Sequence, residues 1–235
     1  MPLICVQGLT KRFGEVRAVQ DLTFDVAEGR ITGFLGPNGA GKTTTLRMLL
    51  GLIRPTAGSA LIDGHPYREL PRPRRVVGAV LDATGFHPGR SGRDHLRVLA
   101  GTTGVPLARI DVVLEQVSLT ADAGRRVQGY SLGMRQRLGL ASALLGDPRV
   151  LILDEPANGL DPAGVAWLRA FLRGLAADGR TVLVSSHALA EIAQTVDDVV
   201  IISSGSLQYS GPLAGLSDAG TSLEDAFLRL TGAQS

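Results

Sequence analysis

The stretch Gly36-Pro37-Asn38-Gly39-Ala40-Gly41-Lys42-Thr43 decides how this chain folds. The apolar run Ile31–Leu35 precedes it, and a helix-like pattern begins at Thr44. Glycine residues let the backbone curl so that its N–H groups face inward, and the positive end of a following helix adds to the resulting anion cradle. The stretch therefore predicts a phosphate-binding loop between a strand and a helix, which is the context that a P-loop requires.

Lys42 and Thr43 carry the specific chemistry of this loop. The Lys42 ammonium is expected to reach the outer phosphates, and the Thr43 hydroxyl to bind magnesium. Only Lys11 and Lys42 are lysines among 24 cationic residues, and a compact ammonium suits a phosphate cradle better than a planar guanidinium. A plain glycine-rich turn is the other interpretation, which the flanking strand and helix disfavour. We predict that ATP with Mg2+ is bound by Gly36, Pro37, Asn38, Gly39, Ala40, Gly41, Lys42, Thr43 and Thr44.

The composition limits the classes of protein to which this chain can belong. The chain has 235 residues, of which 44% are hydrophobic and 20% charged, which indicates a globular protein with a sizeable core. A net charge of +2 without a long basic run means that no nucleic-acid partner is expected. We find neither a run of about 18 apolar residues for a membrane helix nor a signal peptide, so another chain must span any membrane involved. The single cysteine, Cys5, is expected to be buried and inert.

Short continuous apolar runs predict the sheet. Such runs are typical of strands buried on both faces, and helical patterns lie between them. Strands that alternate with helices indicate an α/β fold with a mostly parallel sheet, here a P-loop core. The predicted strands lie at 31–35, 76–81, 150–153, 182–184 and 199–202.

Two regions break this alternation. Leu22, Phe24 and Val26 alternate with polar residues, and Asp63-Gly64 is typical of a hairpin turn, so we expect an N-terminal antiparallel β subdomain. From about Thr84 to Gly129 we find helical patterns but no convincing strand, and Leu107, Ile110, Leu114 and Val117 form one apolar stripe there.

We predict a single domain over residues 1–235. Its core would comprise about 1–83 and 146–235, and an inserted helical subdomain about 84–145. Near the end of the chain, Ser222 and Asp225 are spaced as in a capping box, so a closing amphipathic helix is expected.

Two carboxylates follow the apolar run at 150–153. Asp154 and Glu155 would lie at the carboxyl end of a buried strand, where ligands bind in open parallel sheets. Asp154 is expected to hold magnesium, and Glu155 to polarise the water that attacks the γ-phosphate. Acidic residues before a proline such as Pro156 are also common in plain turns, but the phosphate loop favours the catalytic interpretation.

Residues 130–137, Tyr-Ser-Leu-Gly-Met-Arg-Gln-Arg, resemble the signature motif of ATP-binding cassette (ABC) proteins. The resemblance covers almost the whole sequence, and its motifs stand in the order found in the family. They are the phosphate loop, the signature, LILDEP at 151–156, Gly159-Leu160-Asp161 as the D-loop, and Ser186-His187 with the switch histidine. The resemblance implies an ATP-hydrolysing domain.

The resemblance also implies roles for single residues. Phe13 matches the aromatic position that stacks on adenine, although an N-terminal phenylalanine is otherwise more often a core residue. His187 matches the residue that contacts the γ-phosphate, and Asp161 belongs to the nucleotide-binding D-loop. Ser131 and Gly133 match positions that contact the γ-phosphate bound by the opposite subunit. Without the resemblance, Ser131 would be an ordinary helix N-cap.

The sequence departs from the family pattern at two places. In the signature, Leu132 replaces a glycine and Met134 a glutamine, while Ser131 and Gly133 are kept. Asp82 stands where the family usually has a magnesium-contacting glutamine, and we count it as a candidate metal ligand. Both departures, together with the tail SLEDAF, resemble ATPases of bacterial antibiotic-resistance and peptide-antibiotic export systems, including the bacitracin type.

The resemblance implies the ATP-hydrolysing subunit of a bacterial exporter for an antibiotic, a peptide or another hydrophobic compound. Its expected partners are a second ATPase copy, which dimerises on binding nucleotide, and separate membrane-spanning permease subunits. The expected location is the cytoplasm, on the inner face of the membrane through the permease. A soluble ABC ATPase acting on ribosomes or DNA is the alternative, but two cassettes or long coiled-coil insertions are usual there. A P-loop kinase or GTPase is disfavoured by the signature.

Overall fold

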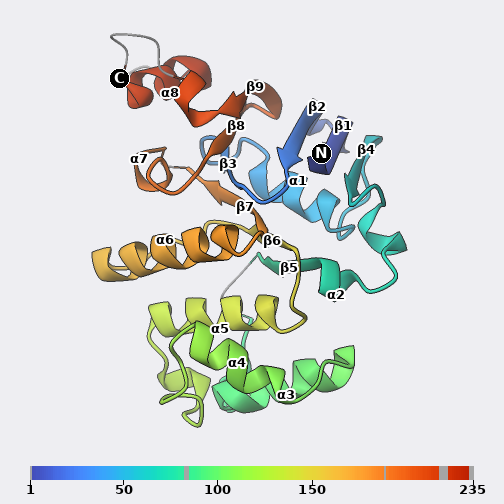
Figure 1. The fold of residues 1–235 in the computed structure, drawn as a ribbon. Helices are drawn as coiled ribbons and strands as arrows, with labels where there is room; N and C mark the ends of the chain where they lie inside the picture. Colours follow the sequence, from blue (N-terminus) through green and yellow to red (C-terminus); the bar gives the residue numbers. More distant parts are fainter. Residues whose placement is uncertain (1, 82–84, 188, 217–221, 233–235) are drawn as a thin grey trace. The chain divides into compact units, whose positions relative to one another are not determined.

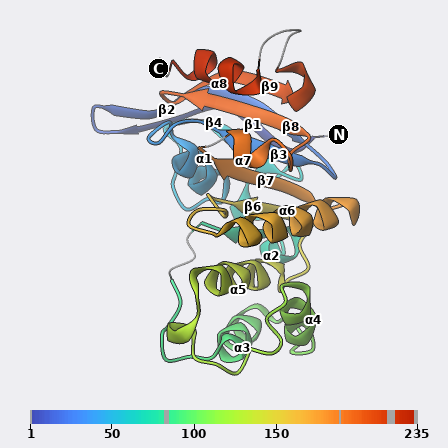
Figure 2. The same cartoon turned by 90° about the vertical axis from the view of Figure 1, so that its left-hand side faces the viewer.

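The computed structural model describes residues 2–81, 85–187, 189–216 and 222–232. The chain divides into two compact units, Met1–Pro71 with Arg169–Ser235, and Arg72–Leu168. Both units are drawn in Figures 1 and 2.

A mostly parallel set of strands forms the centre of the first unit. Strand β3 (Ile31–Leu35) lies between β7 (Thr181–Ser186) and β8 (Asp198–Ser203) and runs parallel to both. Strand β9 (Ser206–Pro212) pairs antiparallel with β8. All five residues of β3 are buried, as expected of a continuous apolar run with strands on both sides.

An antiparallel sheet is the second layer of this unit. Its order is β2 (Val16–Ala27), β1 (Pro2–Phe13) and β4 (Ala57–Ile62). The Phe24 ring of β2 stacks on the Phe34 ring of β3 with a centroid distance of 5.4 Å, which joins the two layers. The predicted α/β fold with an N-terminal antiparallel part is therefore confirmed. The turn at Asp63-Gly64 leads to an isolated bridge between Ile62 and His65 rather than to a second long strand.

Short helices complete the first unit. They are α1 (Lys42–Leu49), η1 (Tyr67–Glu69), α7 (Leu189–Ile192), η3 (Leu213–Gly215) and α8 (Leu223–Thr231). The predicted closing helix is α8, and the Ser222 hydroxyl accepts a hydrogen bond from the Asp225 backbone N–H (3.0 Å). Its buried Phe227 lies on the face that packs toward β8, β9 and α7.

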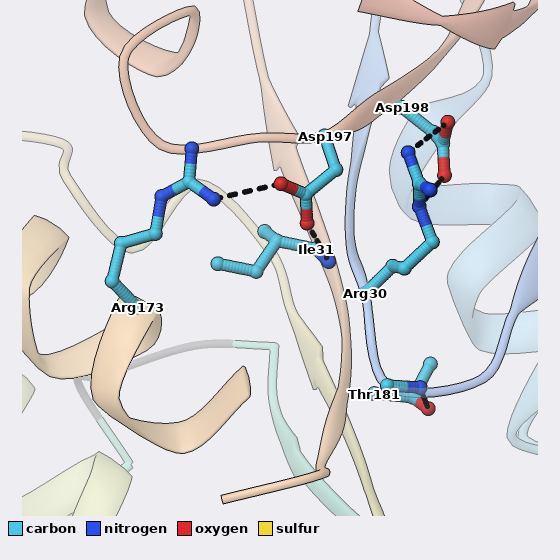
Figure 3. A network of polar contacts seen from close by, with 7 residues as sticks. Arg30, Ile31, Arg173, Thr181, Asp197 and Asp198 are labelled. Atoms are coloured by element: carbon cyan, nitrogen blue, oxygen red, sulfur yellow. Dashed lines mark hydrogen bonds and ion pairs between the residues drawn. The ribbon is translucent and has the colours of Figure 1, made fainter. Parts of the chain in front are cut away.

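Figure 3 shows a polar network at the amino-terminal ends of the parallel strands. The Asp197 carboxylate accepts a hydrogen bond from the Ile31 backbone N–H (2.9 Å) and pairs with Arg173 (2.7 Å). Next to it, Arg30 pairs with Asp198 at 2.6 Å. Asp197 therefore supplies the hydrogen-bond partner of the first backbone N–H of β3, a fully buried strand, at this end of the sheet.

We expect Asp197→Ala to lower the free energy of unfolding by about 1–3 kcal/mol, because the Ile31 N–H loses its partner in a partly buried place. Asp198→Ala is the matched control. It removes only a partly exposed ion pair, with side-chain exposures of 45% for Arg30 and 18% for Asp198, which is worth about 0–1 kcal/mol. Urea unfolding of both variants measures the difference, and equal losses would contradict the role of Asp197.

The second unit contains two parallel strands and the main helices. Strand β5 (Val77–Val80) pairs with β6 (Val150–Leu153). Helices α3 (Gly92–Thr103), α4 (Arg109–Gln116) and α5 (Leu132–Leu144) pack against one another (Figure 2). The remaining elements are α2 (Pro73–Val76), η2 (Val127–Gly129) and the first part of α6 (Pro162–Ala177). The predicted helical subdomain, about 84–145, lies within this unit, and its boundaries stay a prediction.

The predicted apolar stripe is correct except at one end. Ile110, Leu114 and Val117 are at most 2% exposed, whereas Leu107 is 63% exposed. The physical reason is that α4 begins only at Arg109, so Leu107 precedes the helix and does not share its face.

Candidate functional site

Two glycines of the loop at 36–43, Gly36 and Gly41, are required by close packing in the first unit. A Cβ at Gly36 would overlap the carbonyl oxygen of Ile202. At Gly41, where φ is +102°, a Cβ would lie 2.5 Å from the Ala18 carbonyl oxygen. A side chain at either place would displace the backbone, so the tight curve between β3 and α1 depends on these glycines.

Lys42 lies inside this curve. It is only 6% exposed, and its Nζ donates to the carbonyl oxygen of Gly36 at 2.7 Å and reaches that of Pro37 at 3.4 Å. It is the first residue of α1, whose first turn holds no acidic side chain. Thr43 and Thr44 follow it in that turn, and both are half-buried. A largely buried ammonium beside the amino-terminal end of a helix favours a strongly anionic ligand.

His187 leaves the sheet beside this loop. Leu35 of β3 is paired with Ser186 of β7 in the parallel register. The next residues, Gly36 and His187, therefore follow neighbouring strands at the same carboxyl edge, where ligands bind in such sheets. His187 is exposed, so its imidazole is accessible to a ligand at that edge.

Phe13 is not a core residue. It is the last residue of β1 and is 49% exposed. Lys11 places its Nζ 4.8 Å from the centre of the Phe13 ring and also donates to the Arg54 carbonyl oxygen at 2.8 Å. An exposed ring held in place by a neighbouring cation is suited to stacking on a planar ligand.

In the second unit, Asp154 and Glu155 follow β6 directly. The Asp154 N–H donates to the Val80 carbonyl oxygen of β5 at 2.8 Å, which continues the ladder by one bond. Glu155 has a φ of +48°, in the left-handed region that a glutamate rarely adopts. Both side chains are half-buried. Such strained positions concentrate at functional sites. Asp82, which follows β5, lies outside the described residues.

Ser131 and Gly133 lie at the amino-terminal end of α5. Ser131 is the N-cap, and its hydroxyl oxygen accepts a hydrogen bond from the Met134 N–H at 3.2 Å. Ser131 is exposed and Gly133 half-buried, so this end of the helix can receive an anion. In the same way Asp161 caps α6, since its Oδ1 accepts a hydrogen bond from the Gly164 N–H at 2.8 Å.

Tyr130 anchors this helix end, a role that the sequence motifs did not indicate. Tyr130 is 3% exposed, and its hydroxyl donates to the Asp122 carbonyl oxygen at 2.8 Å. Burial, and to a smaller degree the Asp122 carboxylate, raises the pKa of the Tyr130 hydroxyl, which therefore stays a donor. The available signal was an aromatic residue directly before an N-cap serine.

The residues fit a nucleoside triphosphate. In the first unit, the curved loop with its buried Lys42 suits phosphate, and the Thr43 hydroxyl is an oxygen ligand of the kind that magnesium prefers. In the second unit, the Asp154 carboxylate is a ligand of the same kind. A strand, a glycine loop, a helix that starts at a buried lysine and a carboxylate after another parallel strand define a P-loop nucleotide-binding protein.

Comparison with known proteins narrows this class. Residues 19–158 match the family described as ABC transporter. The bacitracin transport ATP-binding protein BcrA of Bacillus licheniformis is 45% identical over 208 residues, which are 87% of this chain and 68% of that protein. The lantibiotic transport ATP-binding protein SrtF of Streptococcus pyogenes is 34% identical over 89% of this chain and 92% of its own length.

A solved structure of an ATP-binding subunit of an ABC transporter has a TM-score of 0.86 at 27% identity and covers 97% of this chain and 99% of its own. The chain belongs to the ABC transporter family, as an ATP-binding and ATP-hydrolysing subunit of the kind that works with membrane permease components. None of the described helices has the length and apolar character needed to span a bilayer.

Proposed function

We propose that this subunit hydrolyses ATP with Mg2+ in a site built on the loop at 36–43. Lys42 neutralises the outer phosphates, while Thr43 and Asp154 supply oxygen ligands to magnesium. Glu155 orients and polarises the attacking water, and His187 contacts the γ-phosphate. Phe13 stacks on adenine, and Asp161 orders the D-loop. The observation that carries this assignment is the buried Lys42 ammonium inside the glycine curve, with His187 leaving the same sheet edge.

We propose further that two copies of the chain hydrolyse ATP together. Ser131 and Gly133 lie at the accessible amino-terminal end of α5, which is suited to the terminal phosphate of a nucleotide bound by a second copy. ATP would then hold two copies together, and hydrolysis would release them. In this proposal Asp82 remains a candidate magnesium contact, although it lies outside the residues that the structure describes.

The transporter is proposed to be a bacterial exporter of a peptide antibiotic or another hydrophobic compound. The support is the similarity to ATP-binding proteins named for bacitracin and lantibiotic transport. The chain would work on the cytoplasmic face of the membrane, where separate permease subunits hold it. The segment 82–93, which follows β5 and includes the first two residues of α3, is the proposed contact with the permease.

Affinity purification of the tagged chain from detergent-solubilised membranes tests the partner. We expect a multi-spanning membrane protein to be recovered in stoichiometric amount. Recovery of ribosomal proteins alone would refute the exporter and favour a soluble ATPase acting on ribosomes. An untagged strain is the control for non-specific binding.

A further inference from the structure

Two leucines and two glycines interlock in the second unit. Leu132 and Gly133 open α5, while Gly159 and Leu160 lie in the turn before α6. A methyl group at Gly159 would lie 2.6 Å from Leu132 Cδ2, closer than two carbons can approach, and one at Gly133 would lie 3.7 Å from Leu160 Cδ2. Each leucine therefore covers the glycine of the other segment, so the signature motif and the D-loop of one chain are in direct contact.

This contact depends on the residue that departs from the usual signature. Leu132 stands where a glycine is commoner, and a glycine has no side chain that could reach Gly159. Leu132 remains 41% exposed, although a buried environment would be favourable for a leucine. Gly159, with a φ of +71°, offers the surface without a Cβ on which the Leu132 methyl group rests.

Backbone hydrogen bonds connect this contact to Glu155. The Asn158 N–H donates to the Glu155 carbonyl oxygen and the Leu160 N–H to that of Ala157, both at 3.1 Å. On the other side, Leu160 also packs on Gly164, where a Cβ would lie 3.2 Å from Leu160 Cβ. A displacement of α5 at Leu132 would thus be passed through two consecutive turns to the backbone of Glu155.

We propose that Leu132 is a positioning residue that couples the two ATP sites of the dimer. When Ser131 and Gly133 of one chain close on the nucleotide of the second copy, Leu132 presses on Gly159 and brings Glu155 of its own chain into the catalytic arrangement. Occupation of one site then activates the other, so hydrolysis depends cooperatively on ATP concentration. This inference rests on the proposed dimeric function.

Steady-state hydrolysis by purified chains tests the coupling. We expect Leu132→Ala to lower kcat about three- to tenfold and to bring the Hill coefficient for ATP close to one, with KM changed less than kcat. Leu160→Ala should act in the same way, and the double variant should lose less than the sum of the two single effects, because both weaken the one junction between α5 and the turn before α6. Leu132→Met, which keeps the apolar bulk, should restore cooperativity.

Two further measurements distinguish a loss of coupling from a loss of folding and from a loss of dimer formation. Leu107→Ala, which truncates another exposed leucine of the same unit, should behave as wild type. In a Glu155→Gln background, Leu132→Ala should still form the ATP-dependent dimer in gel filtration.

Unchanged cooperativity in Leu132→Ala, additive effects of Leu132→Ala and Leu160→Ala, or loss of the dimer would each overturn the proposal. If the Glu155→Gln chain with Leu132 intact also fails to dimerise, the proposed dimeric function itself is wrong, which is a separate result.

Discussion

Glu155→Gln is expected to bind ATP as tightly as the wild type while its kcat falls by about two to four orders of magnitude, the contribution typical of a general base. Glutamine has the size of glutamate but carries no charge that could polarise a water molecule. Since hydrolysis is what separates the two copies, the variant should accumulate as an ATP-bound dimer. Phosphate release and gel filtration with ATP measure the two effects.

Glu115→Gln is the matched control for this experiment. It makes the same exchange at an exposed position of α4 in the same unit and should hydrolyse ATP at the wild-type rate. Wild-type turnover in Glu155→Gln would remove Glu155 from its proposed role. The left-handed backbone at Glu155 is equally unfavourable for glutamine, so the exchange should alter charge rather than local strain.

Lys42→Ala is expected to weaken ATP binding by about ten- to a hundredfold, because a hydrogen bond to a charged group contributes about 1.5–3 kcal/mol. The variant also leaves the Gly36 carbonyl oxygen without the bond from Nζ, so the loop should lose part of its shape. Titration with a fluorescent ATP analogue measures the affinity. Thermal unfolding without nucleotide shows whether the fold survives.

Two further variants make the Lys42 experiment specific. Lys42→Arg keeps the charge but introduces a planar guanidinium, which does not fit the narrow curve between Gly36 and Gly41, so it should also lose affinity. Arg47→Ala removes an exposed cation from the same helix and should bind ATP almost normally. ATP affinity that is unchanged in Lys42→Ala would refute the assignment of the phosphate loop.

The local patterns of the sequence were sufficient for the class of fold. A continuous apolar run before glycines and a lysine predicted β3, the loop and α1, because buried strands and phosphate loops depend on neighbouring residues along the chain. The capping pair Ser222 and Asp225 predicted α8 for the same reason, and the structure has that hydrogen bond. The order of the motifs predicted the family, and the match over residues 19–158 confirms it.

The tertiary structure decided which residues that are distant in the sequence lie next to one another. The pairing of Leu35 with Ser186 brings Gly36 and His187 to one edge, although about 150 residues separate them, and no local pattern encodes a strand register. Burial of Tyr130 against its own subdomain and the resting of Leu132 on Gly159 likewise depend on how distant segments pack. The sequence by itself determined which chemical groups this protein has and on which local elements they stand. Only the fold determined which of them meet, because side-chain contacts between distant segments follow from the packing of the whole core.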